Sequence, residues 1–193
     1  MLGFLARHPL GLLRLPAVLP ALIAFALGRC DHGALKSALI RATLGGHRRA
    51  EIESWTAQFL RSLPQRVFTD ALTRVAHHRA AGDTLVLLSA STDLYVPAIA
   101  GALGFTQCIC TGVEWQGERL VGRLTTPNRR GEEKVRCLQR LRSQYPGAAV
   151  SAYGNSAEDI PHLAEAEHPT LVNGSARART LAAAHGIPCT RWD

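Results

Sequence analysis

The chain has 193 residues, of which 47% are hydrophobic and 19% are charged, and this composition excludes a globally disordered protein. Its length fits one domain of ordinary size, or a core domain with a small insert. The formal charge of +7 favours anionic partners, although a coding bias towards arginine explains it equally well. Five scattered cysteines indicate buried thiols in a reducing cytosol and do not predict a zinc site.

The first 80 residues are predicted to be helical. The stretch 10–27 is rich in apolar residues, and stripes with a helical period run through 34–44, 50–63 and 67–80. Residues 15–28 carry no charge, yet they are fewer than the ~20 that a membrane-spanning helix needs. We therefore expect a buried or interfacial helix, whose flanking Arg14 and Arg29 also suit docking on anionic lipid. The expected location is the cytoplasm, peripheral at the inner membrane if that segment binds lipid.

After residue 83 the pattern changes to strands that alternate with helices. Strands are predicted over 84–88, 106–112, 148–153, 170–172 and 187–192, and helices over 93–103, 132–145, 157–165 and 176–185. The segment 113–124 reads as a hairpin that turns near Gly117. This alternation predicts an α/β fold with a parallel sheet and right-handed crossovers. We expect a helical cap over 1–80 and an α/β core over 81–193.

Polar side chains follow several of these predicted strands. Ser89 comes directly after Leu85–Leu88, where its hydroxyl and the next backbone amides can donate to a phosphate oxygen. Lys134 lies near a helix start, where an ammonium can neutralise a phosphoryl group, and Asn155 and Asp159 offer oxygens to a divalent cation. Taken singly, each residue has an ordinary structural explanation as a cap, a solvated helix residue or a first-turn anion. Their common position at strand ends favours one shared site.

Three segments in this order carry a resemblance to a known family: Leu85–Ser91, Pro127–Lys134 and Tyr153–Asp159. With them the chain resembles the haloacid dehalogenase superfamily, in particular subfamily IB of phosphoserine-phosphatase-like enzymes, near bacterial proteins related to phosphatidylglycerophosphatase C. The resemblance implies a Rossmann-like, three-layer parallel sheet with an N-terminal helical cap. It also implies a Mg²⁺-dependent hydrolase that acts on phosphomonoesters.

The resemblance also implies roles for particular residues. It assigns phosphate binding to Ser89, phosphoryl stabilisation to Lys134, Mg²⁺ ligation to Asn155 and Asp159, and substrate binding to Ser91, Asn128 and Arg130. The implied substrate is a phosphorylated small molecule or a lipid phosphate. Nucleic acid is not an expected partner, because the arginines are dispersed and no basic motif is interleaved with aromatics. The oligomeric state cannot be read from the sequence.

Two departures from the family pattern matter. The segment Tyr153–Asp159 corresponds to the family's fourth motif. Asn155 stands where this motif usually has Asp, so it offers a metal an oxygen without a charge. The first motif, an apolar strand followed by Asp-x-Asp-Gly-Thr, is absent, and with it the nucleophile and the acid/base. Asp31 follows Arg29-Cys30 in a helical context and does not replace it.

The missing motif is also expected to remove the central first strand of the sheet. In this family the missing strand lies between the strands that end at Ser89 and at Tyr153. These two strands must then pair directly, or the natural product must begin upstream of Met1. We favour the second, with a start codon placed too late or a truncated gene. The chain as written is expected to show no phosphatase turnover. The alternative is a non-catalytic phosphate- or lipid-binding pseudoenzyme at the membrane surface.

Overall fold

The computed structural model describes residues 15–193, so the predicted apolar start from Leu10 lies partly outside the described residues. The chain forms two compact units. Of the described residues, unit 1 comprises 15–66 and Ser89–Asn128, and unit 2 comprises Val67–Leu88 and Arg129–Asp193. These limits do not follow the predicted division at residue 80, and the assignment of a cap and a core stays a prediction.

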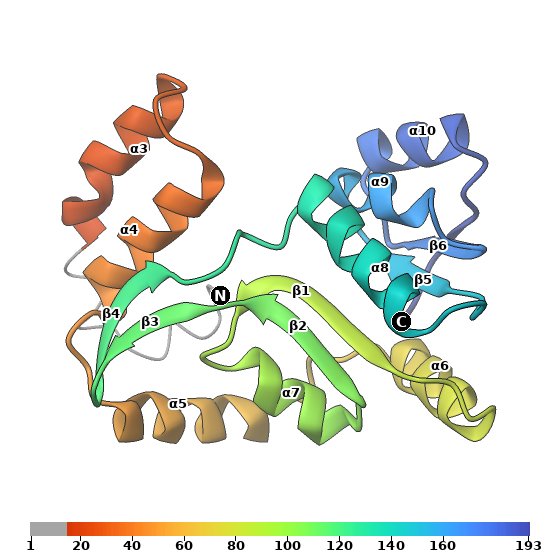
Figure 1. Ribbon diagram of the computed structural model, residues 1–193, viewed down its shortest axis with the longest axis horizontal. Helices are drawn as coiled ribbons and strands as arrows, with labels where there is room; N and C mark the ends of the chain where they lie inside the picture. The colour runs from red at the N-terminus through yellow and green to blue at the C-terminus, as the bar shows by residue number, and fades with distance from the viewer. Residues whose placement is uncertain (1–14) are drawn as a thin grey trace. The chain divides into compact units, whose positions relative to one another are not determined.

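Unit 1 contains helices from the N-terminal region together with two pairs of strands (Figure 1). Its helical elements are η1 (Leu15–Val18), α3 (Leu19–Ala26), α4 (His32–Leu44), α5 (Arg49–Arg61) and α7 (Val96–Leu103). Its strands are β2 (Gln107–Thr111), β3 (Val113–Gln116), β4 (Arg119–Leu124) and the second half of β1 (Val86–Thr92).

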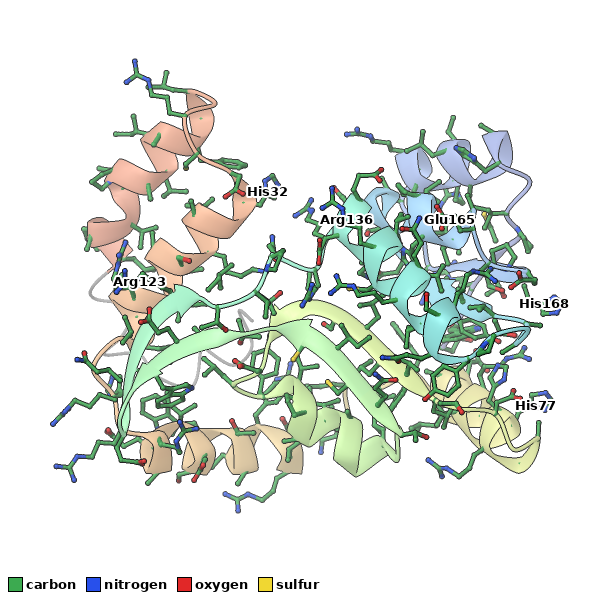
Figure 2. The ribbon with its side chains drawn as sticks, viewed as in Figure 1. His32, His77, Arg123, Arg136, Glu165 and His168 are labelled. Carbon is green, nitrogen blue, oxygen red and sulfur yellow. The ribbon has the colours of Figure 1, made fainter. Side chains whose placement is uncertain are left out.

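Local sequence signals explain where these elements begin and end. Asp31 caps α4, because its Oδ1 accepts the Ala34 N–H at 2.7 Å, and this contact gives Asp31 a structural role. The helix α7 ends at Gly104, whose φ of 72° lies in the left-handed region. The predicted hairpin is confirmed, with β3 and β4 antiparallel on either side of Gly117. Arg123 (labelled in Figure 2) pairs with Glu114 across it at 2.9 Å.

The helix α4 packs closely on β4 in unit 1. Gly122 makes this approach possible, because a Cβ atom there would lie 2.9 Å from the Arg41 backbone nitrogen. Its φ of +87° also disfavours any other residue. Side chains on both elements are almost fully buried, including Ile40 on α4 and Leu120 on β4. This contact holds the helix that carries Lys36 against the hairpin.

Unit 2 contains a parallel sheet with helices (Figure 1). Its elements are α6 (Thr69–Ala80), α8 (Glu132–Gln144), β5 (Ser151–Gly154), η2 (Ala157–Asp159), α9 (Ile160–Leu163), β6 (His168–Val172), α10 (Ala176–Ala184) and β7 (Cys189–Thr190). The predicted parallel arrangement is confirmed for β5, β6 and β7. One buried cluster forms the core, with Leu163, Leu171, Ala178 and Ala182 completely or almost completely shielded from solvent.

The helix α6 belongs to unit 2. His78 of α6 bonds the Tyr153 hydroxyl of β5 through Nε2 at 2.7 Å and the Asp83 carboxylate through Nδ1 at 2.7 Å. Tyr153 also contacts the Trp192 ring. These polar and aromatic contacts attach α6 to the strand that leads into the fourth motif.

The strands between residues 15 and 193 form three sheets, β1 with β2, β3 with β4, and β5 with β6 and β7. Direct pairing of β1 with β5, one of the two outcomes expected without a central strand, is not part of this pattern. Within the same residues, no helix has the length and apolar character that crossing a bilayer requires.

Candidate functional site

The first predicted site residues lie on β1. Ser89 was expected just beyond the end of its strand, but β1 continues to Thr92, so Ser89 lies inside it. The Ser91 N–H donates to Ser89 Oγ at 3.1 Å. The strand extends because it pairs with β2, and the Thr111 hydroxyl of β2 donates to the Ala90 carbonyl at 2.9 Å. The hydroxyl of Ser89 and the amide of Ser91 therefore face each other.

Lys36 contacts predicted site residues, although no sequence pattern indicated this. It belongs to α4, and its Nζ donates to the Ala90 carbonyl at 2.6 Å. The same ammonium donates to Oδ1 of Asn128, a predicted substrate-binding residue. The contact to Ala90 spans 54 positions and that to Asn128 spans 92, so no local spacing signals either of them.

Unit 2 brings together Lys134, from the first turn of α8, and Asp159, which follows β5. Lys134 Nζ lies 2.6 Å from Asp159 Oδ1, and the two side chains are 14% and 7% exposed. The other oxygen, Oδ2, accepts the backbone N–H groups of Asn155 at 3.0 Å and Ser156 at 3.1 Å, and the Ser156 hydroxyl at 2.9 Å. Asp159 thus closes the turn and holds Lys134 in one conformation.

Gly154 makes this turn possible. A Cβ atom at this position would lie 2.6 Å from the Cβ of Asp159, which is too close for any other residue. The sequence Gly154-Asn155-Ser156 therefore lets the strand end turn directly under the carboxylate. Gly154, the glycine of the fourth motif, is therefore required for steric reasons that do not depend on catalysis.

The surroundings of Asp159 keep it ionised. Burial by itself raises the pKa of this carboxyl, but the Lys134 ammonium and the donors of Asn155 and Ser156 outweigh it and hold the pKa below its usual value. The helix that carries Lys134 is anchored in a similar way. The buried carboxylate of Glu133 pairs with Arg129, with Arg136 at 3.2 Å and with Arg140 at 3.1 Å (Arg136 is labelled in Figure 2).

His162 was also missed by the sequence analysis. It lies on α9, three positions after Asp159, and is 6% exposed. Its Nδ1 is buried without a hydrogen-bond partner among the described residues. Burial, assisted by the Lys134 ammonium, lowers its pKa to about 4, so the ring is neutral near pH 7. The signal for it was weak, because a single His on an apolar helix face has many structural explanations.

The remaining predicted site residues have more exposed positions. Arg130 pairs with Glu158, and both side chains are more than two-fifths exposed. Asn155 is exposed, and its backbone, not its amide group, bonds Asp159. In unit 1, Ser89, Ser91 and Asn128 are connected through Lys36 and the Ala90 peptide. In unit 2, Lys134, Asn155 and Asp159 are connected directly. That the two groups meet around one phosphate stays a prediction.

The predicted magnesium ligands do not by themselves fit the ion. One oxygen of Asp159 receives an ammonium and the other receives three N–H or O–H donors. Asn155 adds one neutral oxygen, whereas Mg²⁺ prefers an octahedral shell with carboxylates. Between residues 15 and 193 there is no group of three or more His, Cys, Asp and Glu residues that could hold a metal ion. The donor set in unit 2 is therefore incomplete for magnesium.

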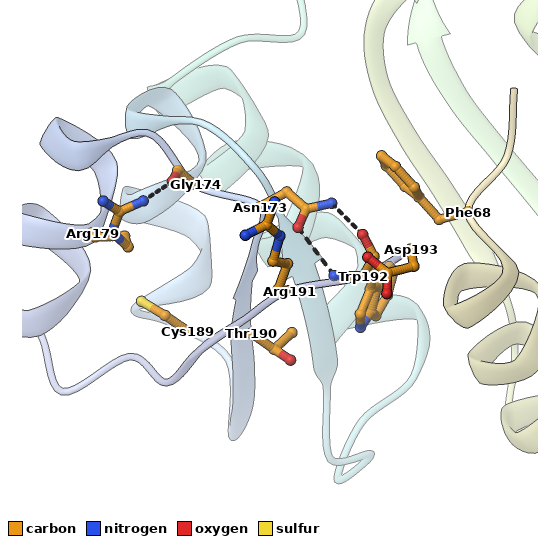
Figure 3. Close-up of a pocket in the computed structure, with 9 residues that line it drawn as sticks. All are labelled: Phe68, Asn173, Gly174, Arg179, Cys189, Thr190, Arg191, Trp192 and Asp193. Carbon is orange, nitrogen blue, oxygen red and sulfur yellow. Dashed lines mark hydrogen bonds between the residues drawn. The ribbon is translucent and has the colours of Figure 1, made fainter.

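A separate hollow of about 780 Å³ lies in unit 2 (Figure 3). Asn173, Arg179, Arg191 and Trp192 line it together with five further residues, and none of the predicted site residues is among them. The Asn173 amide group donates to the Trp192 carbonyl and accepts the Trp192 N–H, each at 3.0 Å. These bonds hold the C-terminal segment against Asn173.

Comparison with known proteins agrees with this architecture. The family model of haloacid dehalogenase-like hydrolases matches residues 1–164. The protein CicA of Caulobacter vibrioides is 35% identical over 165 residues, which are 83% of this chain and 71% of CicA. A probable phosphatase of Mycobacterium tuberculosis is 29% identical over 186 residues, which are 92% of this chain and 64% of that protein.

A solved structure shows the same fold. A probable phosphoserine phosphatase from Vibrio cholerae superposes with a TM-score of 0.75 at 16% identity, covering 92% of this chain and 52% of that one. The chain therefore belongs to the haloacid dehalogenase-like hydrolase family. It has the α/β fold of that family, with parallel strands, helices and an N-terminal helical region.

Proposed function

We propose that this protein is a phosphomonoester-binding member of the hydrolase family, with Lys134 and Ser89 as its phosphate-binding groups. The observation that carries the proposal is the Lys134–Asp159 ion pair, because it holds an ammonium rigidly beside the end of a parallel strand. Ligands of open α/β sheets bind at these strand ends. The probable phosphatase among the relatives supports the same class of substrate.

In this proposal Lys134 offsets negative charge on the phosphoryl oxygens, and Ser89 with the Ser91 amide donates hydrogen bonds to them. Asp159 positions Lys134 and does not touch the substrate. Asn128 and Arg130 contact the remainder of the substrate. The preferred substrate is a phosphate ester with a small or lipid leaving group, as in proteins related to phosphatidylglycerophosphatase C.

We further propose that the 193 residues by themselves do not hydrolyse phosphate esters. No two aspartates in the sequence are separated by one residue, so an Asp-x-Asp motif is not present in it. Hydrolysis then requires a strand that carries Asp-x-Asp-Gly-Thr. The carboxylates of that strand would also supply the oxygens that a magnesium ion needs beyond Asn155 and Asp159.

Phosphatase assays with p-nitrophenyl phosphate and Mg²⁺ test this proposal. The 193-residue chain is expected to give no turnover above background. A chain extended at its N-terminus by an apolar strand ending in Asp-x-Asp-Gly-Thr is expected to gain turnover, and Lys134→Met in that extended chain is expected to abolish it. Turnover by the 193 residues alone would contradict the proposal, as would turnover of the extended chain that Lys134→Met does not reduce.

A second candidate function is binding at the surface of an anionic membrane without catalysis. It is favoured by a stripe of exposed apolar residues on η1, on α3 and at the residue that follows α3, which we call the apolar stripe. Its members are 40–61% exposed: Leu15, Leu19, Leu22, Ile23 and Leu27. Four of the five recur at every fourth position, so they follow one side of a helical segment. Arg29, which follows the stripe, suits anionic headgroups, and the location would be the cytoplasmic face of the inner membrane.

Vesicle co-sedimentation tests this second function. Vesicles containing phosphatidylglycerol are expected to retain the chain, and vesicles of phosphatidylcholine alone are expected to retain less of it. The double variant Ile23→Ser/Leu27→Ser should lose binding, whereas Leu181→Ser, an exposed leucine on α10, serves as the matched control. Equal retention of both variants would exclude the apolar stripe as the membrane-binding surface.

A further inference from the structure

The carbonyl of Ala90 is held by two donors from different elements of unit 1. Lys36 Nζ approaches it from α4 at 2.6 Å, and the Thr111 hydroxyl approaches it from β2 at 2.9 Å. Thr111 is completely buried, so its donor has a fixed position. Ala90 itself lies between two predicted phosphate-site residues, Ser89 and Ser91. The backbone at this point is therefore fixed by contacts that the sheet alone does not provide.

Fixing this carbonyl also orients the amide on the other side of the same peptide group. The peptide bond is planar and trans, so the Ala90 carbonyl and the Ser91 N–H point in opposite directions. The Ser91 N–H accordingly points away from Lys36 and meets Ser89 Oγ at 3.1 Å. A cation on the carbonyl also polarises the peptide group, which makes its N–H a stronger donor.

The same ammonium orients the side chain of Asn128. An ammonium only donates hydrogen bonds, so the atom of Asn128 that faces it must be the amide oxygen. The amide NH₂ group then points away from Lys36 and is available in a defined direction. One lysine thus sets the direction of two N–H donors, on Ser91 and on Asn128.

We propose that Lys36 is a positioning residue for anion binding in unit 1. It orients and polarises the Ser91 amide, which holds Ser89 Oγ, and it directs the Asn128 NH₂ group, so that the Ser89 hydroxyl and the Asn128 NH₂ group donate to the oxygens of a phosphate monoester. Through Lys36 the helix α4 takes part in ligand binding, although it lies far from the family motifs in sequence. This role rests on the proposed phosphate-binding function and extends it to the N-terminal helices.

The test is a titration of the ¹⁵N-labelled 193-residue chain with inorganic phosphate, followed by the Ser91 amide resonance. Lys36→Met is expected to weaken phosphate binding about tenfold or more, the scale of one charge-assisted hydrogen bond. The Ser91 amide proton should also move upfield in the free variant, because its peptide group is no longer polarised. Arg41→Met is the matched control, since it removes one exposed positive charge from the same helix.

Lys36→Arg keeps a cationic donor and is expected to restore most of the affinity and the Ser91 resonance position. This variant also covers the case in which Lys36→Met does not fold. A Lys36→Met chain that matches Arg41→Met in both affinity and Ser91 resonance would overturn the proposal, as would a folded Lys36→Arg chain that lacks phosphate affinity.

The variant Ser89→Ala distinguishes an error in the role of Lys36 from an error in the proposed phosphate-binding function. If Ser89→Ala weakens phosphate binding and Lys36→Met does not, only the role of Lys36 is wrong. If the unmodified chain shows no saturable phosphate binding, the proposed function and the role of Lys36 are both wrong.

Discussion

The two units each hold one lysine against predicted site residues, but the partners of the two lysines differ. Lys134 in unit 2 is paired with the buried carboxylate of Asp159. Lys36 in unit 1 donates to two neutral oxygens, the Ala90 carbonyl and the Asn128 amide. Removing either partner of the Lys134–Asp159 pair leaves a buried charge without its partner, whereas removing the Lys36 side chain leaves only neutral groups. We therefore expect the unit 2 contact to control stability and the unit 1 contact to control the direction of donors.

The largest effect is expected from Asp159→Ala. It leaves the largely buried Lys134 ammonium without its carboxylate and removes the acceptor that closes the turn. The loss in the free energy of unfolding should be about 3–5 kcal/mol, measured by urea denaturation at pH 7.

Glu158→Gln, at the neighbouring position, provides the control. Its pair with Arg130 is exposed, so its loss should cost no more than about 1 kcal/mol. Equal losses for the two variants would show that the burial of the Lys134–Asp159 pair has no energetic consequence.

The next effect concerns the pH dependence that His162 imposes on unit 2. Burial first, then the Lys134 ammonium, lowers its pKa from 6.5 to about 4, so the unfolded chain takes up the proton at higher pH than the folded chain. The contribution of neutral His162 to the free energy of unfolding is therefore fully present above pH 6.5. It decreases by about 3 kcal/mol as the pH falls towards 4.

His162→Met removes the titrating ring while keeping a side chain of similar size. The difference in unfolding free energy between the original chain and this variant should change steadily between pH 7 and pH 4. Asp159 affects stability at lower pH than His162. Its contribution to the free energy of unfolding is lost only as the pH falls through its lowered pKa in the folded chain. A difference that stays flat from pH 7 to pH 4 would contradict the buried, neutral state of His162.

A smaller effect is expected where α4 packs on β4. Gly122→Ala places a Cβ atom against the Arg41 backbone at a position with φ of +87°. Gly117→Ala also has positive φ, at +55°, but nothing lies within 4 Å of its added Cβ. Gly122→Ala should therefore be less stable than Gly117→Ala by about 1–3 kcal/mol in urea denaturation. Similar losses for both would show that the close approach of helix and hairpin is not needed.

The comparison of the lysines also shows what the sequence can reveal. Lys134 and Asp159 were predicted as site residues because each lies in a recognisable local pattern, and unit 2 joins them. Lys36 has no such pattern, since its partners lie on β1 and in the loop after β4, and only the packing of α4 brings them within reach.

Local sequence patterns also predicted parts of the secondary structure. Gly104 and Gly117 marked a helix end and a hairpin turn correctly. The end of β1 was predicted too early, because pairing with β2 and the bond from Thr111 extend it through Ser89. The burial of His162 Nδ1 without a hydrogen-bond partner among the described residues could not be predicted either, because burial depends on how the whole unit packs.

Calorimetric titration with inorganic phosphate tests the central claim most directly, that Ser89 and Lys134 both bind the phosphoryl group of a ligand. We expect saturable binding of one phosphate per 193-residue chain. Ser89→Ala and Lys134→Met should each weaken it about tenfold or more, because each removes a hydrogen bond to a charged ligand. Absence of saturable binding, or an affinity that neither substitution changes, would contradict the account.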